Sequence, residues 1–393
     1  MEFLRDTKFD FMKYRRYWVA VSVILVVTSV VAIFVHGKLN IGVDFAGGTQ
    51  LTLQFREEPA VDEIRGILVG AGLDDAQIQQ FGESGSNEVL VKTPVAEEGA
   101  LANQERILTA LDRRYNADAR GLDLNRAGAG AVAGLLAQLD PEGVMEAGGD
   151  TAVAYYDGIG ESILDARTDV GIFASWEQVA SAEGVSPETL EALRENAHLG
   201  TIALLGAENV GPQIGQELRT KGILAVVLSL VGMLVYIWVR FELRFGIGAV
   251  IAAFHDVMVV LGLYALLDFE FNLTTVAAFL TLIGYSVNDT VVIFDRVREN
   301  LRLTRREPLI DLINRSLNQT LTRTILTSGT TLLATGSLLV LGGDVLRGFA
   351  FVLSVGIAVG TYSSVYVAAP FAILWEELTS RRATAQKGAS KAA

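Results

Sequence analysis

The stretch Asn272–Phe294, NLTTVAAFLTLIGYSVNDTVVIF, decides the fold class of this chain. It is 23 residues long, and Asp289 is its one charged residue. An α-helix needs about 20 residues to cross the hydrocarbon core of a bilayer, so the stretch predicts a transmembrane helix. An ionisable group inside such a helix costs about 3 kcal/mol even on mild scales, which makes it a candidate functional site.

Five further apolar stretches are long enough to cross a bilayer. Apolar residues make up 51% of the 393 residues, and the mean hydropathy is +0.38. The first stretch is longer than the apolar core of a signal peptide, and no small-x-small cleavage site follows it. We therefore expect an uncleaved anchor and six transmembrane helices in all, the other five at 17–35, 222–239, 245–267, 325–343 and 348–374.

Basic residues predict the orientation of these helices. Lys and Arg gather before the first span, between the second and third, between Arg296 and Arg323, and in the tail. Short basic loops stay in the cytoplasm, so both termini are expected inside and the long segment 37–221 outside. The predicted segments are a cytoplasmic start (1–16), a span (17–36), the outer domain (37–221), spans (222–294), a cytoplasmic loop (295–324), spans (325–375) and a cytoplasmic tail (376–393).

The outer segment predicts an α+β domain. Thr49–Phe55 alternates as a half-buried strand does, helical spacing follows, and Asn87–Thr93 reads as another strand before a second helix. This order suggests a ferredoxin-like sheet with helices on one face. From about 120 to 200 the pattern becomes Ala/Gly/Glu-rich and helical, with Ser186-Pro187 starting a helix. We expect an insertion here, with outer bounds of about 95–205.

Charge and composition exclude several kinds of site. Residues 36–221 carry a net charge of −17 and the rest +4, so nucleic acid, which needs a basic face, is not an expected partner. The acidic excess reads as a solvated surface. Cysteine is absent and the three histidines have no metal-ligand spacing, so we expect no disulfide, metal ion or other cofactor.

Asp289 and Arg323 are the strongest candidates for chemistry. Arg323, at the start of the fifth apolar stretch, can reach the depth of Asp289 along its own stem. Each shares a helix face with further polar residues, Tyr285 and Thr281 for the aspartate and Thr327 with Thr330 or Thr331 for the arginine. Small residues that would allow close helix approach lie nearby, namely Gly284, Ser286, Gly329 and Gly336.

Two interpretations of this pair remain open. A carboxyl group that gains and loses a proton beside a permanent cation can couple proton passage to a change of shape; alternatively, the two form a static ion pair that fixes helix packing. His255 and Asp256 occupy adjacent helix positions about 100° apart, so they are not expected to line one path, and Asp256 is expected to bond to Ser or Thr of a neighbour. The supporting polar residues are Asn288, Thr290, Thr327, His255 and Asp256.

Several runs resemble the SecF family, the smaller membrane subunits of the SecDF protein-export accessory, itself similar to proton-driven transporters of the RND superfamily. The longest is YSVNDTVVIFDRVREN at 285–300, followed by NQTLTRT at 318–324. Shorter matches are GVDFAGGT at 42–49, VGPQIG at 210–215, RFE at 240–242 and HDV at 255–257. The resemblance covers roughly 1–95 and 205–376, and the insertion departs from it.

The resemblance implies a SecD partner whose homologous half completes an RND-like bundle of twelve helices. It implies that Asp289 and Arg323 conduct protons, which are the coupling ion, and that a third acidic residue belongs to SecD. The implied activity is the use of the proton-motive force to export secretory polypeptides from the Sec channel, SecYEG, in the bacterial inner membrane. YajC, YidC and membrane lipid are further implied contacts.

Two further features have an open interpretation. Gly47 and Gly48, before a strand, and Gly211-Pro212, before the second span, suit a hinge between span and domain or an ordinary tight turn. Leu309, Ile313 and Leu317 share one face of 305–317, which predicts a cytoplasmic interfacial helix that contacts lipid or a partner.

Three alternatives compete with a proton-driven subunit of protein export. One is half of an RND-type exporter of lipids or small molecules. The second is an intramembrane hydrolase built from Ser286, His255 and Asp256, although no Gly-x-Ser-x-Gly or His-Glu-x-x-His pattern is present; we therefore expect no enzyme activity. The third is a structural scaffold, if no buried group titrates.

Overall fold

The computed structural model describes residues 7–35, 39–82, 85–94, 100–117, 119–144, 149–240, 243–304 and 307–379. They form two compact units, Met1–Gly42 with Glu217–Ala393 and Val43–Gln216. Several predicted features lie outside the described residues: Phe241 and Glu242 of the RFE run, Arg305 and Arg306, the sequence after the first span at 36–38, and the basic tail beyond Thr379.

The first unit is a bundle of long helices, six of which are long and apolar enough among the described residues to cross a membrane. This number confirms the sequence prediction. The helices are α1 (Arg15–Val35), preceded by the short η1 (Phe11–Tyr14), α9 (Pro212–Arg240), α10 (Leu243–Leu266), α11 (Leu273–Leu303), α12 (Leu309–Leu341) and α13 (Gly343–Ser363), which continues into the π-helical η3 (Ser364–Ala368).

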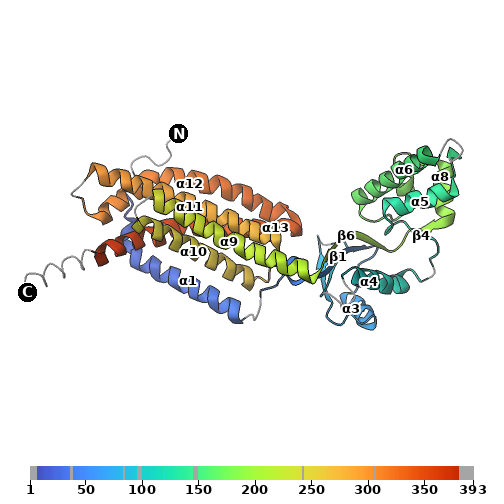
Figure 1. The fold of residues 1–393 in the computed structure, drawn as a ribbon, viewed down its shortest axis with the longest axis horizontal. Helices are drawn as coiled ribbons and strands as arrows, with labels where there is room; N and C mark the ends of the chain where they lie inside the picture. Colours follow the sequence, from blue (N-terminus) through green and yellow to red (C-terminus); the bar gives the residue numbers. More distant parts are fainter. Residues whose placement is uncertain are drawn as a thin grey trace, which may run out of the picture. The chain divides into compact units, whose positions relative to one another are not determined.

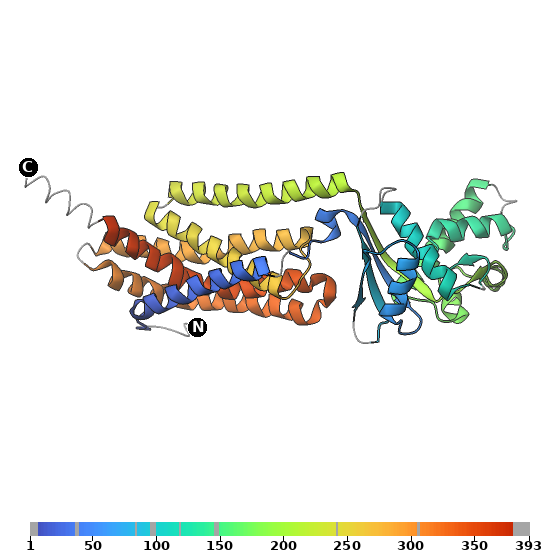
Figure 2. The ribbon, with the colours of Figure 1, turned by 90° about the horizontal axis from the view of Figure 1, so that it is seen from below.

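Helix α13 holds the bundle together, because it packs against α10, α11 and α12, while α1 packs against α10 (Figure 1). One apolar core joins η1, α10, α11, α12 and η3 through buried residues such as Met12, Phe245, Phe294 and Ala368. Helix α9 runs along the edge of the bundle (Figure 2) and adds Ile237 to this core, whereas most of its apolar residues are exposed.

The segment 295–324, predicted as a cytoplasmic connection with a helix at 305–317, is helical over most of its described residues, because α11 continues to Leu303 and α12 begins at Leu309; its cytoplasmic location stays a prediction. The predicted interfacial helix is wrong. Ile313 and Leu317 are buried in the core of the bundle, and Leu309 packs against it. An apolar stripe looks the same whether it covers protein or lipid, so its pattern did not distinguish the two.

The predicted close-packing glycines are also not the ones that the structure uses. A Cβ at Gly284, Gly329 or Gly336 would meet no atom within 4 Å among the described residues. Contacts that leave no room for a Cβ occur instead at Gly262, which faces Ser29 of α1, and at Gly356, which faces Leu282 of α11.

The second unit contains a four-stranded antiparallel sheet in the order β2-β3-β1-β6. Its elements follow one another as β1 (Gly48–Phe55), α3 (Val61–Gly70), β2 (Gln77–Phe81), β3 (Glu88–Thr93), α4 (Ala100–Tyr115) and β6 (Ile202–Val210), after the short α2 (Val43–Ala46). Helices α3 and α4 bury their apolar sides on one face of the sheet (Figure 2), in a core that includes Leu51, Val91, Ile64 and Ile107. This is the predicted ferredoxin-like arrangement.

The insertion is shorter than predicted, because α4 belongs to the ferredoxin-like sheet. It occupies the residues between Tyr115 and Ile202. Its elements are β4 (Leu122–Asp123), α5 (Ala129–Leu139), α6 (Gly149–Val170), α7 (Trp176–Ala180), α8 (Pro187–Asn196) and β5 (Ala197–His198), and they enclose a core of their own. Ser186 caps α8 by accepting the N–H of Thr189 at 3.0 Å, as predicted.

Polar contacts fix the base of the insertion. Arg56, which follows β1, donates to the carbonyls of Phe173, Leu199 and Gly200 at 3.2–3.4 Å. Buried Arg167 of α6 donates to the carbonyls of Leu124 and Ala127, both at 2.8 Å. In β4, Asp123 accepts the N–H groups of Asn125 and Gly200 at 2.9 and 3.0 Å. These bonds satisfy backbone groups of residues that lie outside the helices and strands.

Candidate functional site

Asp289 lies inside the helix bundle, on α11, with 3% of its surface exposed. Its Oδ2 accepts a hydrogen bond of 3.2 Å from the hydroxyl of Ser328 on α12. That hydroxyl in turn accepts one of 2.8 Å from Thr361 on α13. Three helices therefore meet at this carboxyl group through a chain of two hydroxyls.

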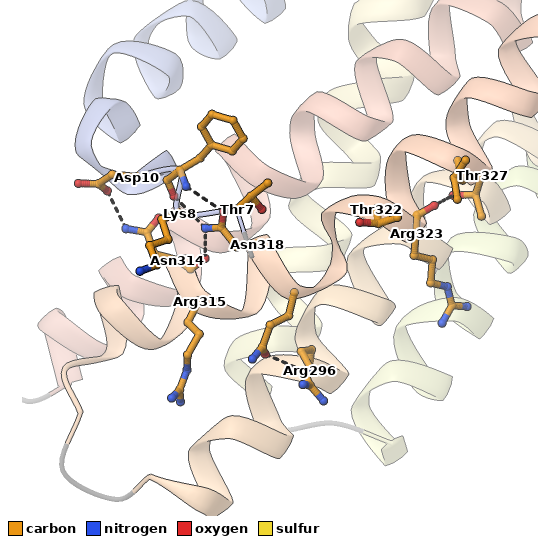
Figure 3. Close-up of a pocket in the computed structure, with 13 residues that line it drawn as sticks. Thr7, Lys8, Asp10, Arg296, Asn314, Arg315, Asn318, Thr322, Arg323 and Thr327 are labelled. Atoms are coloured by element: carbon orange, nitrogen blue, oxygen red, sulfur yellow. Dashed lines mark hydrogen bonds between the residues drawn. The ribbon is translucent and has the colours of Figure 1, made fainter. Parts of the chain in front are cut away.

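Arg323 does not form the expected ion pair with Asp289. Among the described residues no cationic nitrogen lies within 4.0 Å of the Asp289 carboxylate. Arg323 is exposed and lines a pocket of about 1220 Å³, together with Arg296 and Arg315 (Figure 3). A guanidinium on a long stem keeps more of its hydration in such an open pocket than beside a buried carboxylate.

The predicted polar stripes of α11 and α12 meet at one contact, where the hydroxyl of Tyr285 lies 3.5 Å from that of Thr331. Ser328, which donates to Asp289, was not part of the predicted stripe. Thr327 donates to the carbonyl of Arg323 at 2.9 Å and so bonds within its own helix. Asn288 is exposed. The site around Asp289 is thus made of hydroxyls.

Asp256 forms a second buried polar cluster. Its Oδ2 accepts hydrogen bonds from Ser286 of α11 at 2.5 Å and from Ser363 of α13 at 2.8 Å, which confirms the prediction that Asp256 bonds to serine or threonine of a neighbour. Its Oδ1 lies 2.9 Å from Nδ1 of His255. Adjacent helix positions point about 100° apart, yet the side chains of these two residues are in direct contact.

Sequence reasoning missed the contribution of α13. Thr361 and Ser363 each contact one of the two clusters, and Ser364 lies 3.0 Å from the hydroxyl of Thr290. The signal was present as the run Gly360-Thr361-Tyr362-Ser363-Ser364 in the last apolar stretch. Hydroxyls bond readily to their own helix backbone, so such a run does not by itself indicate contacts between helices.

The order of groups around Asp256 differs from that of a serine hydrolase. In a catalytic triad the imidazole lies between the serine and the carboxylate and takes the proton of the serine. Here the carboxylate lies between Ser286 and His255. Ser286 is also 1% exposed, and its hydroxyl donates to the carboxylate and not to the imidazole.

The two glycines at the start of β1 need the conformational freedom of glycine. Gly47 and Gly48 have φ values of 74° and 148°, and a Cβ on Gly48 would meet the carbonyl of Thr93. Gly211 shows no such requirement, and Pro212 starts α9 at the first helical position, where proline fits well. The hinge role of these four residues remains a prediction.

Two family models match the chain. Residues 189–378 match the model described as "Protein export membrane protein SecD/SecF, C-terminal", and residues 32–58 match "SecD/SecF GG Motif". The first covers α10 to α13 and both polar clusters. Proteins named "Protein translocase subunit SecF" are similar over nearly the whole chain, among them one from Koribacter versatilis, 40% identical over 98% of this chain and 96% of its own.

This chain belongs to the SecF family. A second SecF, from Pseudomonas aeruginosa, is 34% identical over 94% of this chain and 92% of its own. Among solved structures, the crystal structure of SecDF from Thermus thermophilus, described as a translocon-associated membrane protein, is similar with a TM-score of 0.67 and 32% identity. The match covers 96% of this SecF-family chain and 40% of the SecDF chain. Most of the insertion, by contrast, lies outside both family models, which leave 59–188 between them unmatched; only its end, with most of α8 and with β5, falls within the first model.

Proposed function

We propose that this chain is one half of a proton-driven complex that promotes export of secretory polypeptides. A SecD-like half supplies the rest of the bundle, the Sec channel SecYEG delivers the polypeptide, and YajC or YidC are further partners. The complex lies in the bacterial inner membrane with both termini of this chain in the cytoplasm. Protons are its coupling ion, and no cofactor or covalent chemistry takes part.

The proposal rests on the surroundings of Asp289, a buried carboxyl group that accepts a hydrogen bond from a neutral hydroxyl. Ionisable groups in a membrane bundle are costly and mark ion pathways, and this carboxyl group is bonded to a neutral hydroxyl among the described residues. It can gain or lose a proton without breaking an ion pair. The Ser328 hydroxyl both donates and accepts, so it can serve either form of the carboxyl group.

Membership of the SecF family supports protein export over the export of lipids or small molecules. The similarity to a structure named SecDF supports a SecD-like partner, since this chain matches only 40% of that structure's chain. Purification of the chain from its own membrane tests this choice. Recovery of a SecD-like protein and of the Sec channel agrees with the proposal, whereas their absence favours the exporter.

The variant Asp289→Asn tests the proton step. Asparagine keeps the size of the side chain and an oxygen that accepts from Ser328, but it cannot exchange a proton at neutral pH. In membrane vesicles that carry the assembled complex, we expect export to lose its dependence on the proton-motive force, while membrane insertion and complex assembly stay normal.

The matched control is Asp311→Asn, which neutralises an exposed carboxylate in the first turn of α12. It changes the net charge by the same amount and should leave proton-driven export unchanged. Normal proton-driven export by Asp289→Asn would refute the proposal. So would an equal loss in both variants, because the effect would then follow from charge alone.

A further inference from the structure

His255 has a buried ring nitrogen without a partner at the edge of an apolar cavity. The side chain is 5% exposed, and Nε2 makes no hydrogen bond with any described residue. The cavity has a volume of about 350 Å³ and lies between α1, α10 and the end of the last span. Its lining is apolar except for Ser22, His255 and Tyr366. Leaving a nitrogen buried in this way costs about 1–3 kcal/mol.

Asp256 determines which nitrogen carries the hydrogen. When Asp256 is ionised its carboxylate only accepts hydrogen bonds, so the contact of 2.9 Å between Oδ1 and Nδ1 of His255 then requires the hydrogen on Nδ1. In the neutral ring the lone pair then lies on Nε2, the nitrogen without a partner. His255 is therefore arranged to receive a proton at Nε2.

We propose that His255 and Asp256 form a second protonation site, which exchanges protons with water admitted to this cavity. A water molecule occupies about 30 Å³ in the liquid, which is less than the volume of the cavity, and Ser22, His255 and Tyr366 are its polar lining residues. Nε2 itself is covered in this structure, so water reaches it only when the lining moves. Uptake of a proton at Nε2 turns a neutral ring beside a carboxylate into a bonded ion pair. No unpaired charge is then buried, which is the condition for holding a charge in an apolar interior.

The neighbours of this pair come from four elements. The titratable ones are the phenols of Tyr362, whose ring centre lies 6.3 Å from that of His255, and of Tyr366, which lines the same cavity. Helix α1 contributes the hydroxyl of Ser22, 2.8 Å from that of Tyr362. Helix α11 contributes the hydroxyl of Ser286, which donates to Asp256.

Helix α13 links the second site to the first. Ser363 donates to Asp256, and Thr361, two residues earlier, donates to the Ser328 hydroxyl that bonds to Asp289. A change of charge at either carboxylate therefore acts on the same turn of one helix. Directly after that turn the helix becomes π-helical from Ser364, a local form that is frequent at functional sites. This role extends the proposed proton-driven function to two coupled sites.

Nitrogen NMR on the full chain in lipid bilayers tests the site directly, because the chain has three histidines. With ¹⁵N-labelled histidine, the signals absent from His255→Gln belong to His255. We expect hydrogen on Nδ1 at high pH and on both nitrogens at low pH. A ring that keeps one protonation state across the pH range, or that carries its single hydrogen on Nε2, overturns the proposal.

Export by the assembled complex tests the functional part. We expect His255→Gln to reduce proton-driven export severalfold and to shift its pH profile, whereas Met258→Leu, one turn along α10 and close in volume, leaves both unchanged. A normal pH profile in His255→Gln overturns the role of the second site. The two proposals fail separately, because the NMR titration does not require Asp289 to conduct protons and Asp289→Asn does not alter His255.

Discussion

Replacement of Gly262 by alanine should weaken the contact between α1 and α10. The Cβ added in Gly262→Ala would overlap the Cα, Cβ and Oγ of Ser29. Atoms of a helix backbone cannot rotate out of the way as a side-chain end can, so α1 has to move. Helix α1 also forms one wall of the cavity beside His255, so its displacement changes that cavity.

The size of the effect follows from two opposing contributions. Carbon atoms pack best at about 3.5–4.0 Å, so the helices must separate by about 1 Å, and overpacking of this kind costs about 1–3 kcal/mol. Alanine is better than glycine in a helix interior by about 1 kcal/mol. Gly284→Ala on α11 provides the matched control, because its Cβ meets no described atom within 4 Å and only the favourable contribution applies.

Unfolding of the purified full chain in bicelles, driven by a denaturing detergent, measures the free energy of unfolding of both variants. We expect Gly284→Ala to be more stable than Gly262→Ala by about 1–3 kcal/mol, the overpacking contribution. Equal stability of the two, or a more stable Gly262→Ala, would show that α1 does not pack against α10 as closely as described.

The insertion supplies two further predictions. Arg167→Met leaves the carbonyls of Leu124 and Ala127 without this donor, which costs about 1–3 kcal/mol of folding free energy for each carbonyl. Hydrogen exchange at the base of the insertion should therefore be faster in this variant. The control is Arg194→Met, whose arginine lies over a tryptophan ring; equal exchange in both variants would contradict the expectation. Burial raises the pKa of Asp123 above its ordinary value, so the folded state binds the proton more tightly than the unfolded state does. The resulting protection of the base of the insertion from hydrogen exchange should be full below about pH 4 and should fall as the pH rises through the pKa of the folded state. Asp123→Asn should remove this dependence, and the same pH profile in the variant would rule out Asp123 as its cause.

The number of spans and the type of outer domain could be predicted from sequence, because each rests on a local pattern. A run of about 20 apolar residues has few alternatives to a membrane helix. The alternation in Thr49–Phe55 places Leu51, Leu53 and Phe55 on the buried side of β1, as the structure has them. The change of pattern at about 120 lies close to the start of the insertion after α4, whereas the bound of about 95 was too early, because the helix that follows β3 belongs to the sheet.

The candidate site was predictable only in part. The free-energy cost of an ionisable group inside a membrane identifies Asp289 and Asp256 by itself, since a carboxyl group in an apolar helix is rare. Their partners depend on which helix turns face one another, and helical spacing does not fix the rotation of one helix against the next. This is why Ser328 rather than Arg323 contacts Asp289, and why Thr361 and Ser363 were missed.

Infrared difference spectroscopy of the assembled complex in lipid vesicles tests most directly whether the Asp289 carboxyl group changes its protonation during work. Spectra are compared with and without an imposed proton gradient, and the band of a protonated carboxyl group is assigned by its loss in Asp289→Asn. We expect this band to change with the gradient in the parent protein and to be absent from the difference spectrum of the variant. A difference spectrum that is identical in the two would contradict proton exchange at Asp289.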